Sequence, residues 1–455
     1  MSKALKNITK LNNIVSVLDF YANGVSGALV DPTGVVDSTL GIAAAWAASK
    51  YITFPAGTYK VSSLPNFAVN GARIETIGKV IINYTGTGNG LIVDAGAGAG
   101  VKNYDIQIGP MTINGSASAT NGVYIRGITH STFKRLRPIN FPLSAMRTEF
   151  MVSNTFEDFC YSGNEAGITV PTAKGIILEK RNAGEQSSDC TFINPIIEGT
   201  TGDGIYGTEA AQCTFIGGTS EGNGTGGGAG GVYLGPNSFS NTFIGLDLEN
   251  NGKAADATSY HVKNYGFRNR FITPFCDAVI SGLFWVAGGN SLSIEGGQIS
   301  SLQIDAGVKN TNTIGVAYSG TLTDNGTDTH HLNLYYIIGA VTVIDSNVTT
   351  GTWTPVATSL TGPGTPAYTA NYQKVGKVCT FSIYMPTTGG TVTSAAGSTN
   401  FTLPFSVGAS LGVAVAASNG SGAGLGNCFI GGGNRVYTPT FTDSFAVISG
   451  SYITP

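Results

Sequence analysis

Polar and apolar residues alternate in a short pattern that recurs through the middle of the chain. Each copy places a threonine before a phenylalanine, with a small residue ahead of both. Because neighbouring residues of a strand face opposite sides, this alternation predicts short strands with one buried face. The repeated phenylalanines are Phe133, Phe156, Phe192, Phe215, Phe243 and, in a looser copy with arginine in place of threonine, Phe271.

A second pattern, glycine followed by valine or isoleucine, precedes most copies of the first. It begins at Gly122, Gly175, Gly204 and Gly231. The repeated phenylalanines are 23, 36, 23, 28 and 28 residues apart, and periods of about 20 to 50 residues are typical of solenoids and propellers. A propeller blade needs four strands, so two strands per repeat favour an all-β fold: a right-handed parallel β-helix, which is a single-stranded solenoid.

Equivalent positions of successive coils stack at the inter-strand distance of about 4.8 Å. We therefore expect the six phenylalanines to form one buried stack of rings. The residues two positions earlier form a second ladder, in which asparagine amides bond to the next coil: Ser131, Asn154, Cys190, Cys213, Asn241 and Asn269. Cys190 and Cys213 are neighbours in it, near enough for a disulfide by distance alone, but reduced thiols are the favoured prediction.

Composition indicates a folded and weakly charged chain. Of 455 residues 65 are glycine, 42% are hydrophobic and 11% are charged, which is the reverse of the balance in a disordered chain. The net charge of −3 predicts no binding to nucleic acid. The six cysteines form no CxxC pair, so we expect no metal site and no cofactor. Residues 1–21 contain no long apolar run, so we expect no signal peptide and no membrane insertion.

The two ends of the repeat array carry separate signals. A helix-start pattern at Asp37 precedes an alanine-rich segment, which predicts a capping helix at residues 40–48; residues 51–61 follow as strand, turn and strand. Beyond Thr350 the coil patterns stop and alternating strands begin. The predicted domains are an N-terminal arm and β-helix cap at 1–60, a parallel β-helix with the active site at 61–335, a connector at 336–350, and a C-terminal β-sandwich for trimerisation or carbohydrate binding at 351–455.

The N-terminal segments resemble the signature of the pectate-lyase-like β-helix superfamily, which includes many phage tailspike proteins. The resemblance lies in residues 16–24, in the helix start at Asp37 and in the strand Phe54–Tyr59, which matches the family pattern Phe-Pro-Ala-Gly-Thr-Tyr. The family's Gly-Asp-Gly turn is replaced by residues 30–34. With the repeats, the resemblance covers roughly residues 15–335. It implies a homotrimeric tailspike in the virion tail, extracellular after lysis, whose partners are other phage tail proteins and a bacterial surface polysaccharide.

Candidate chemistry comes from acidic residues at one register. Six residues past the repeated phenylalanine, four consecutive coils have an acid: Glu198, Glu221, Glu249 and Asp277. Strand alternation directs the preceding residues inward and these acids outward. Like charges stacked at coil spacing repel each other. Bound cations, interleaved basic residues or catalytic use must therefore offset the repulsion.

Glycoside hydrolysis uses two carboxyls, about 5 to 5.5 Å apart for retention and about 6.5 to 9.5 Å apart for inversion. Neighbouring coils supply the shorter separation, and residues two apart on one strand supply about 6 to 7 Å. Repulsion raises the pKa of one carboxyl and makes it the acid beside a base. The sequence thus predicts an endo-glycoside hydrolase, a polysaccharide depolymerase acting on capsule or O-antigen, with Glu221, Asp247 and Glu249 as catalytic residues. The predicted substrate-binding residues are Glu198, Asp277, Arg268 and Arg270.

Two other functions stay open at this stage. A lyase acting on a uronate-containing polymer would take its base from Lys263, His261, Arg268 or Arg270. A non-catalytic receptor-binding or structural spike would use the acids only to accept hydrogen bonds from backbone N–H groups of the turns. The host, the sugar, a site within or between subunits, and the mode of tail attachment also stay open.

Overall fold

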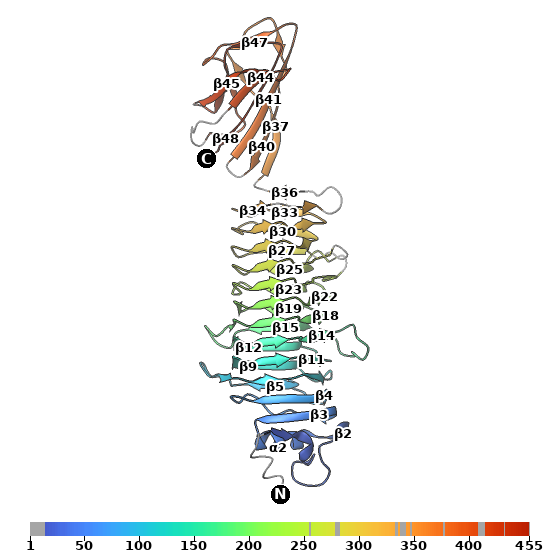
Figure 1. Cartoon of the computed structure of the whole chain (residues 1–455). Coiled ribbons are helices and arrows are strands. Elements are labelled where there is room, and N and C mark those ends of the chain that lie inside the picture. The colour runs from blue at the N-terminus through green and yellow to red at the C-terminus, as the bar shows by residue number, and fades with distance from the viewer. Residues whose placement is uncertain are drawn as a thin grey trace. The chain divides into compact units, whose positions relative to one another are not determined.

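The chain forms two compact units, Met1–Val343 and Ile344–Pro455. A computed structural model describes residues 14–253, 256–277, 283–332, 335–336, 343–345, 348–375, 378–407, 415–431 and 433–454. The first unit consists of coils whose strands pair in parallel, and the second consists of antiparallel sheets (Figure 1). The predicted all-β fold, a parallel β-helix with a capping helix and a C-terminal β-sandwich, is therefore confirmed.

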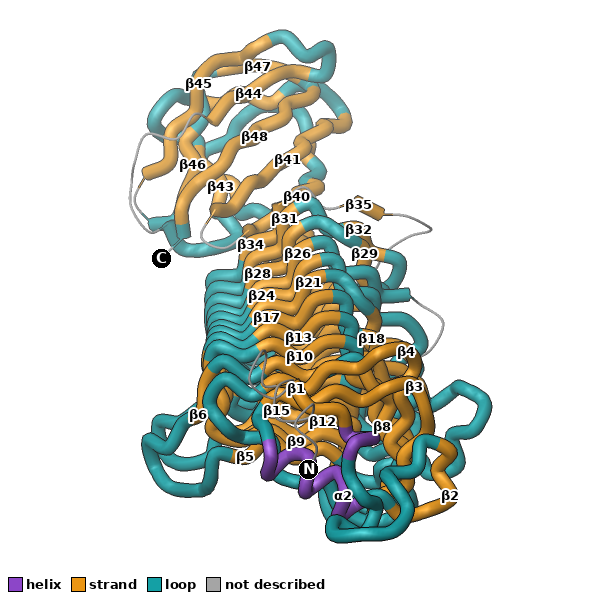
Figure 2. The backbone as a smooth tube through the Cα atoms, turned by 60° about the horizontal axis from the view of Figure 1, so that its bottom comes forward, coloured by secondary structure: helices purple, strands orange, loops and turns teal. Residues whose placement is uncertain are grey.

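Sheet A of the first unit collects the strands that carry the threonine–phenylalanine pattern, and Figure 2 shows them following one another. Its sixteen strands are β1 (Ile14–Ser16), β2 (Thr33–Asp37), β3 (Tyr51–Val61), β4 (Arg73–Tyr84), β7 (Gln107–Ile108), β8 (Met111–Asn114), β10 (Thr132–Lys134), β11 (Leu136–Ile139), β13 (Thr155–Glu157), β17 (Thr191–Ile193), β21 (Thr214–Ile216), β24 (Thr242–Ile244), β26 (Arg270–Ile272), β28 (Ser293–Glu295), β31 (Asn312–Ile314) and β34 (His330–Leu332).

Sheet B collects the strands of the glycine–valine pattern. Its fourteen strands are β5 (Leu91–Asp94), β6 (Asn103–Tyr104), β9 (Asn121–Thr129), β12 (Ser144–Val152), β15 (Lys174–Glu179), β16 (Ser187–Ser188), β19 (Ile205–Gly207), β20 (Ala210–Ala211), β23 (Gly230–Leu234), β25 (Tyr260–Asn264), β27 (Leu283–Val286), β30 (Ser301–Ile304), β33 (Leu322–Asp324) and β36 (Val343–Asp345).

A third face, called flank C here, follows sheet A in each coil after a short turn. It contains two parallel sheets, made by β14 (Cys160–Ser162), β18 (Ile196–Glu198) and β22 (Thr219–Glu221), and by β29 (Gln298–Ile299), β32 (Ala317–Tyr318) and β35 (Tyr335–Tyr336). Parallel bridges from Thr219 to Asp247, from Asp247 to Phe275 and from Phe275 to Gln298 connect the two sheets. Flank C therefore continues through the coils that carry the acids.

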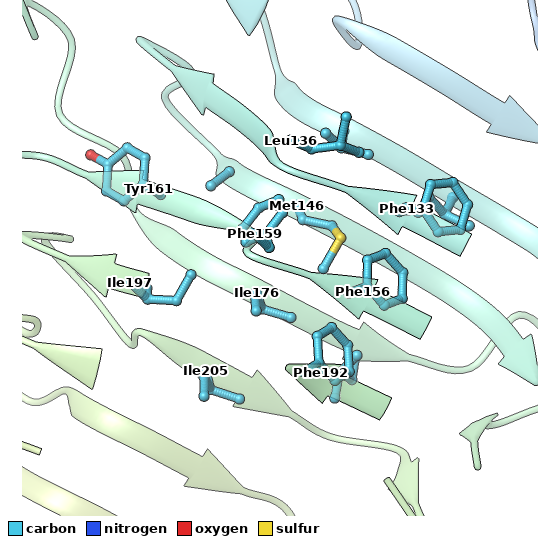
Figure 3. Packing of buried hydrophobic residues seen from close by; sticks show 14 of the residues in the cluster. Phe133, Leu136, Met146, Phe156, Phe159, Tyr161, Ile176, Phe192, Ile197 and Ile205 are labelled. Atoms are coloured by element: carbon cyan, nitrogen blue, oxygen red, sulfur yellow. The ribbon is translucent and has the colours of Figure 1, made fainter. Parts of the chain in front are cut away.

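The predicted ladders fill the interior of the coils. Successive rings from Phe133 to Phe271 pair in register and stack with centroids 4.5–4.9 Å apart, and all six are at most 1% exposed. Figure 3 shows Phe133, Phe156 and Phe192 in file. In the second ladder Asn241 Oδ1 accepts the Cys213 N–H at 3.0 Å, and its amide donates to the Asn269 Oδ1 at 3.0 Å. All six cysteines are free thiols.

The capping helix lies where the sequence predicts it. Helix α2 (Thr39–Ala48) follows the short 3₁₀ helix η1 (Val17–Asp19), and Asp37 Oδ1 accepts the Thr39 N–H at 2.8 Å. Ile42 and Ala45 are fully buried against the first coils. The predicted turn within residues 51–61 is not present: β3 runs through this segment with only a register shift at Pro55.

The second unit has a ten-stranded antiparallel sheet and a two-stranded one, packed around buried side chains that include Phe381, Ile383 and Tyr452. Its strands are β37 (Val348–Trp353), β38 (Ala357–Thr358), β39 (Thr365–Pro366), β40 (Thr369–Val375), β41 (Val378–Thr388), β42 (Val392–Ser394), β43 (Asn400–Thr402), β44 (Val415–Asn419), β45 (Gly424–Gly431), β46 (Arg435–Tyr437), β47 (Phe441–Asp443) and β48 (Phe445–Ile453).

Candidate functional site

The four acids predicted at one register lie along flank C and are called the acid column. Glu198 pairs with Glu221, and the bridges through Asp247 carry the same register onward, so that Glu249 and Asp277 continue the column. The residue before each acid points into the coil and has no exposed surface: Ile197, Ser220, Leu248 and Cys276. The acids therefore point outward, as strand alternation predicts.

A turn that repeats from coil to coil holds this column in place. The residue after the acid has a positive φ, of 68° at Gly199, 62° at Gly222 and 53° at Asn250. Glycine and asparagine are the residues that best tolerate this left-handed conformation. The N–H of Gly199 donates to the Glu221 carbonyl, and the N–H of Gly222 donates to the Glu249 carbonyl. Consecutive turns thus hold consecutive acids at strand spacing.

Asp247 is the most perturbed acid of this region. It lies two residues before Glu249 on the same outward face, between Thr219 and Phe275 of the adjacent coils. One of its carboxyl oxygens is buried and has no hydrogen-bond partner within the described residues. Burial, followed by the charges of Glu249, Glu221 and Asp277, raises the pKa of Asp247 to about 6. The carboxyl is therefore partly protonated near neutral pH.

Glu249 has a raised pKa for similar reasons. Burial contributes most, and the charges of Asp277 and Glu221 add to it. In the part of the chain that the structure describes, its carboxylate has no hydrogen-bond partner. Since Glu249 takes part in the shift at Asp247 as well, the two carboxyls form one coupled group, and protonating one of them favours the charged form of the other.

Asp277 and His261 meet at the end of the column. Asp277 accepts the N–H of Asn250 at 3.1 Å, and His261 Nε2 lies 3.7 Å from its carboxylate and 3.0 Å from its carbonyl oxygen. The imidazole has no exposed surface, and burial lowers the pKa of His261. His261 is therefore a neutral interior residue that supports Asp277 from inside the coil.

The carboxylates of Glu198 and Glu221 accept hydrogen bonds from side chains. Glu198 accepts the Ser162 hydroxyl at 2.8 Å and the Thr219 hydroxyl at 3.4 Å, and Glu221 accepts the Asn250 amide at 3.4 Å. Within the described residues, Asp277 is the member of the acid column whose carboxylate accepts a backbone N–H. Turn capping, the structural alternative for the acids, therefore applies to Asp277 more than to the others.

The predicted basic residues other than His261 make no ion pair with the acid column in the described part of the chain. Arg270 lies on sheet A and makes a two-pronged ion pair with Glu295, its Nε 2.7 Å from one carboxylate oxygen. Arg268 is an exposed residue just before β26, and Lys263 lies on sheet B with its ammonium 3.8 Å from the Trp285 ring centroid. Among the described residues, His261 is therefore the one candidate base that contacts the acid column, and it does so from inside the coil.

Sequence reasoning overlooked Phe275. Its side chain is 39% exposed and its backbone bridges directly to Asp247, so an aromatic ring borders the most perturbed carboxyl. Counting four residues past the repeated phenylalanine, rather than six, gives both Asp247 and Phe275. The signal was therefore present in the repeat.

The described ranges contain neither a metal-binding cluster of side chains nor a helix suited to crossing a membrane. No group of three or more histidine, cysteine, aspartate or glutamate side chains is arranged to hold a metal ion there. None of the helices described is long and apolar enough to cross a membrane.

No known protein family has a sequence pattern that matches this chain, and no curated protein matches it. Similar solved structures include PfbA, a surface adhesin of Streptococcus pneumoniae, at 12% identity and a TM-score of 0.45, covering 71% of this chain and 90% of that chain. A tailspike protein double mutant of E. coli bacteriophage HK620 in complex with pentasaccharide gives 11% identity and a TM-score of 0.45, with 97% and 94% covered.

A third similar structure is the catalytic unit of a GH87 alpha-1,3-glucanase from Streptomyces thermodiastaticus, at 12% identity and a TM-score of 0.44, with 74% of this chain and 70% of that chain covered. Tailspikes are thus among the structures similar to this chain. The parallel β-helix that the N-terminal resemblance implied is the fold observed here.

Proposed function

We propose that the chain is a phage tailspike depolymerase that hydrolyses glycosidic bonds of a bacterial surface polysaccharide, capsule or O-antigen. One observation carries the proposal: the Asp247 carboxyl faces outward, has a buried oxygen without a partner, and has its pKa raised to about 6 by burial and three neighbouring acids. Glycoside hydrolysis requires a carboxylic acid whose raised pKa leaves part of it protonated as the pH approaches neutrality, beside a carboxylate.

In this proposal Asp247 is the general acid and Glu249 is the base. Asp247 donates its proton to the glycosidic oxygen as the bond to the leaving sugar breaks, while the Glu249 carboxylate takes a proton from the attacking water. Residues two apart on a strand are about 6 to 7 Å apart, which suits an inverting reaction. Burial raises the pKa of both carboxyls most, and the charge of Glu221 adds to it. Glu198 and Asp277 bind sugar hydroxyls.

Hydrolysis is favoured over elimination by the placement of the candidate bases. His261 is buried, Lys263 packs on the Trp285 ring, and Arg270 is paired with Glu295. His261 does contact the acid column, with its Nε2 3.7 Å from the Asp277 carboxylate, but its ring has no exposed surface with which to reach a substrate. The other two contacts are to residues outside the column. A lyase would need one such base close to the carbon that loses its proton. Assembly as a homotrimer in the virion tail, with other tail proteins, completes the proposal.

The test is incubation of the purified protein with capsule and lipopolysaccharide from bacterial strains sensitive to one phage. Hydrolysis releases reducing ends without new ultraviolet absorbance, whereas elimination creates an absorbing double bond. We expect the double variant Glu221→Gln, Glu249→Gln to lose cleavage. Glu295→Gln, which removes a carboxylate of sheet A, is the matched control and should keep it. Cleavage at the wild-type rate by the double variant would refute the site.

A further inference from the structure

A pocket of about 270 Å³ lies on the N-terminal side of flank C. Its lining includes Lys79 from β4, Arg135 and Arg137 from the segment around β11, and Asp158 and Cys160 from the next coil. Strand β11 lies beside β14, and in Figure 1 the labels β11, β14, β18 and β22 follow one another along one side. The pocket, called the basic pocket here, therefore shares a face with the acid column.

Three cations contribute to the basic pocket, and the acids around it offset only part of their charge. Arg135 lies 3.4 Å from Asp158, but both side chains are largely exposed, at 72% and 43%, so solvent weakens the pair. Arg137 pairs with Glu165. Lys79 is exposed and has no ion pair among the residues described. The pocket therefore keeps a positive charge.

Arg137 also has an unsatisfied donor. Its Nε is buried and has no hydrogen-bond partner in the described part of the structure. A buried donor without a partner is destabilising, because it has given up its hydrogen bonds to water without replacing them. An arginine presents its donors in a planar fork that fits a carboxylate. The pocket thus supplies a positive charge, and Arg137, which lines it, supplies a guanidinium to a carboxylate ligand.

The repeat register relates the position of the basic pocket to that of Asp247, the proposed general acid. Arg137 and Asp247 each follow a repeated phenylalanine by four residues. Cys160, Ile196 and Thr219 take the same place in the three coils between them, and they pair in that order up to Asp247. Four steps of strand spacing correspond to about 19 Å. An extended oligosaccharide of a few residues spans that distance along flank C.

We propose that the basic pocket binds the carboxylate of an acidic sugar residue in the polymer that the acid column cleaves. The proposal rests on the proposed function and gives the substrate class: a polysaccharide whose repeat contains a uronic acid. The acid column repels negative charge, so neutral sugars occupy it while the uronate lies at Arg137. The polymer is thereby oriented along the coil axis, with its cleaved bond several residues from the acidic one.

The first experiment measures binding alone, using methyl glucuronoside as the probe and methyl glucoside as its neutral counterpart. The full chain carries Glu249→Gln, so that cleavage plays no part. We expect the glucuronoside to bind, and its affinity should fall as salt is added. Its affinity should also fall at least tenfold in Arg137→Gln and severalfold in Lys79→Gln. The matched control Arg147→Gln removes an ion-paired arginine of sheet B with a side-chain exposure of 38%, close to the 36% of Arg137, and should leave affinity unchanged.

Equal affinity for the two probes would overturn the proposal, as would unchanged affinity in both pocket variants. Lys79 is exposed, so its variant tests the pocket even if Arg137→Gln folds poorly. The two proposals fail in distinguishable ways. If the glucuronoside binds at Arg137 but no polysaccharide is cut, the proposed function fails and the pocket stands. If polymers are cut but the pocket variants bind normally, the opposite holds.

Discussion

Replacing Asp247 with asparagine should stabilise the protein at neutral pH, which is unusual for removal of a charge from a surface strand. Asparagine keeps the shape of the side chain and removes the titration. The pKa of Asp247 is about 6 in the folded chain, against an ordinary value of 3.8. Because the pKa of Asp247 is raised in the folded state, the neutral carboxyl contributes its full share of stability below pH 3.8. This contribution is lost as the pH rises through the folded-state pKa of about 6.

The size of the effect follows from the shift. Two pKa units correspond to about 3 kcal/mol for a fully desolvated group. Because the Asp247 side chain is only partly buried, solvent reduces this, and we expect about 1 to 1.5 kcal/mol. The free energy of unfolding of Asp247→Asn should therefore rise relative to wild type between about pH 4 and pH 7, where the wild-type carboxyl gains its charge.

Guanidinium unfolding of both proteins at several pH values, followed by circular dichroism, measures this difference. Glu198→Gln is the control, because the wild-type carboxylate accepts bonds from Ser162 and Thr219 and its loss should bring no gain at neutral pH. A pH profile of Asp247→Asn parallel to that of wild type would show that Asp247 is ordinarily ionised. The assignment of the general acid would then be wrong.

Three further outcomes are expected. Phe215→Ala should lower the free energy of unfolding by about 3 to 5 kcal/mol, because the ring stacks between two others; Phe267→Ala, with a ring 37% exposed, should cost much less, and equal losses would contradict a buried stack. Asn241→Ala should cost about 1 to 3 kcal/mol in the same assay, because the Cys213 N–H loses its acceptor; no loss would contradict the ladder. Glu249→Gln should lower kcat about 100-fold or more with little change in KM, and the wild-type product should have inverted anomeric configuration by NMR.

The coils could be predicted because the same residue type returns to the same place. Phe192 and Phe215 must be equivalent for any fold that repeats, and the residue two positions before each must then form its own ladder. Glu249 followed from the same count, and Asp247 from its place two residues earlier on the same strand face. These predictions use only register and alternation, which the backbone of a β-helix imposes on every coil.

The remaining features depend on partners that no repeat specifies. Arg270 was predicted to bind substrate, yet Glu295, one coil further along, holds its guanidinium. The basic pocket was not predicted at all. Lys79 precedes the first repeated phenylalanine, and Arg137 comes close to it only because β8 lies between β4 and β11. Such neighbours are set by the stacking of coils rather than by any motif.

The stacked coils also act as a ruler. The loops of successive coils differ in length, so the repeated phenylalanines are 23 residues apart in one pair and 36 in another. Yet each coil adds the same single step of strand spacing along flank C, because the backbone ladder is continuous. Deleting one whole coil between Arg137 and Asp247 would shorten the gap by about 4.8 Å and leave both ends intact. In the proposed binding mode, the number of coils between Arg137 and Asp247, rather than the loop sequences, would then determine which polymer repeat length fits.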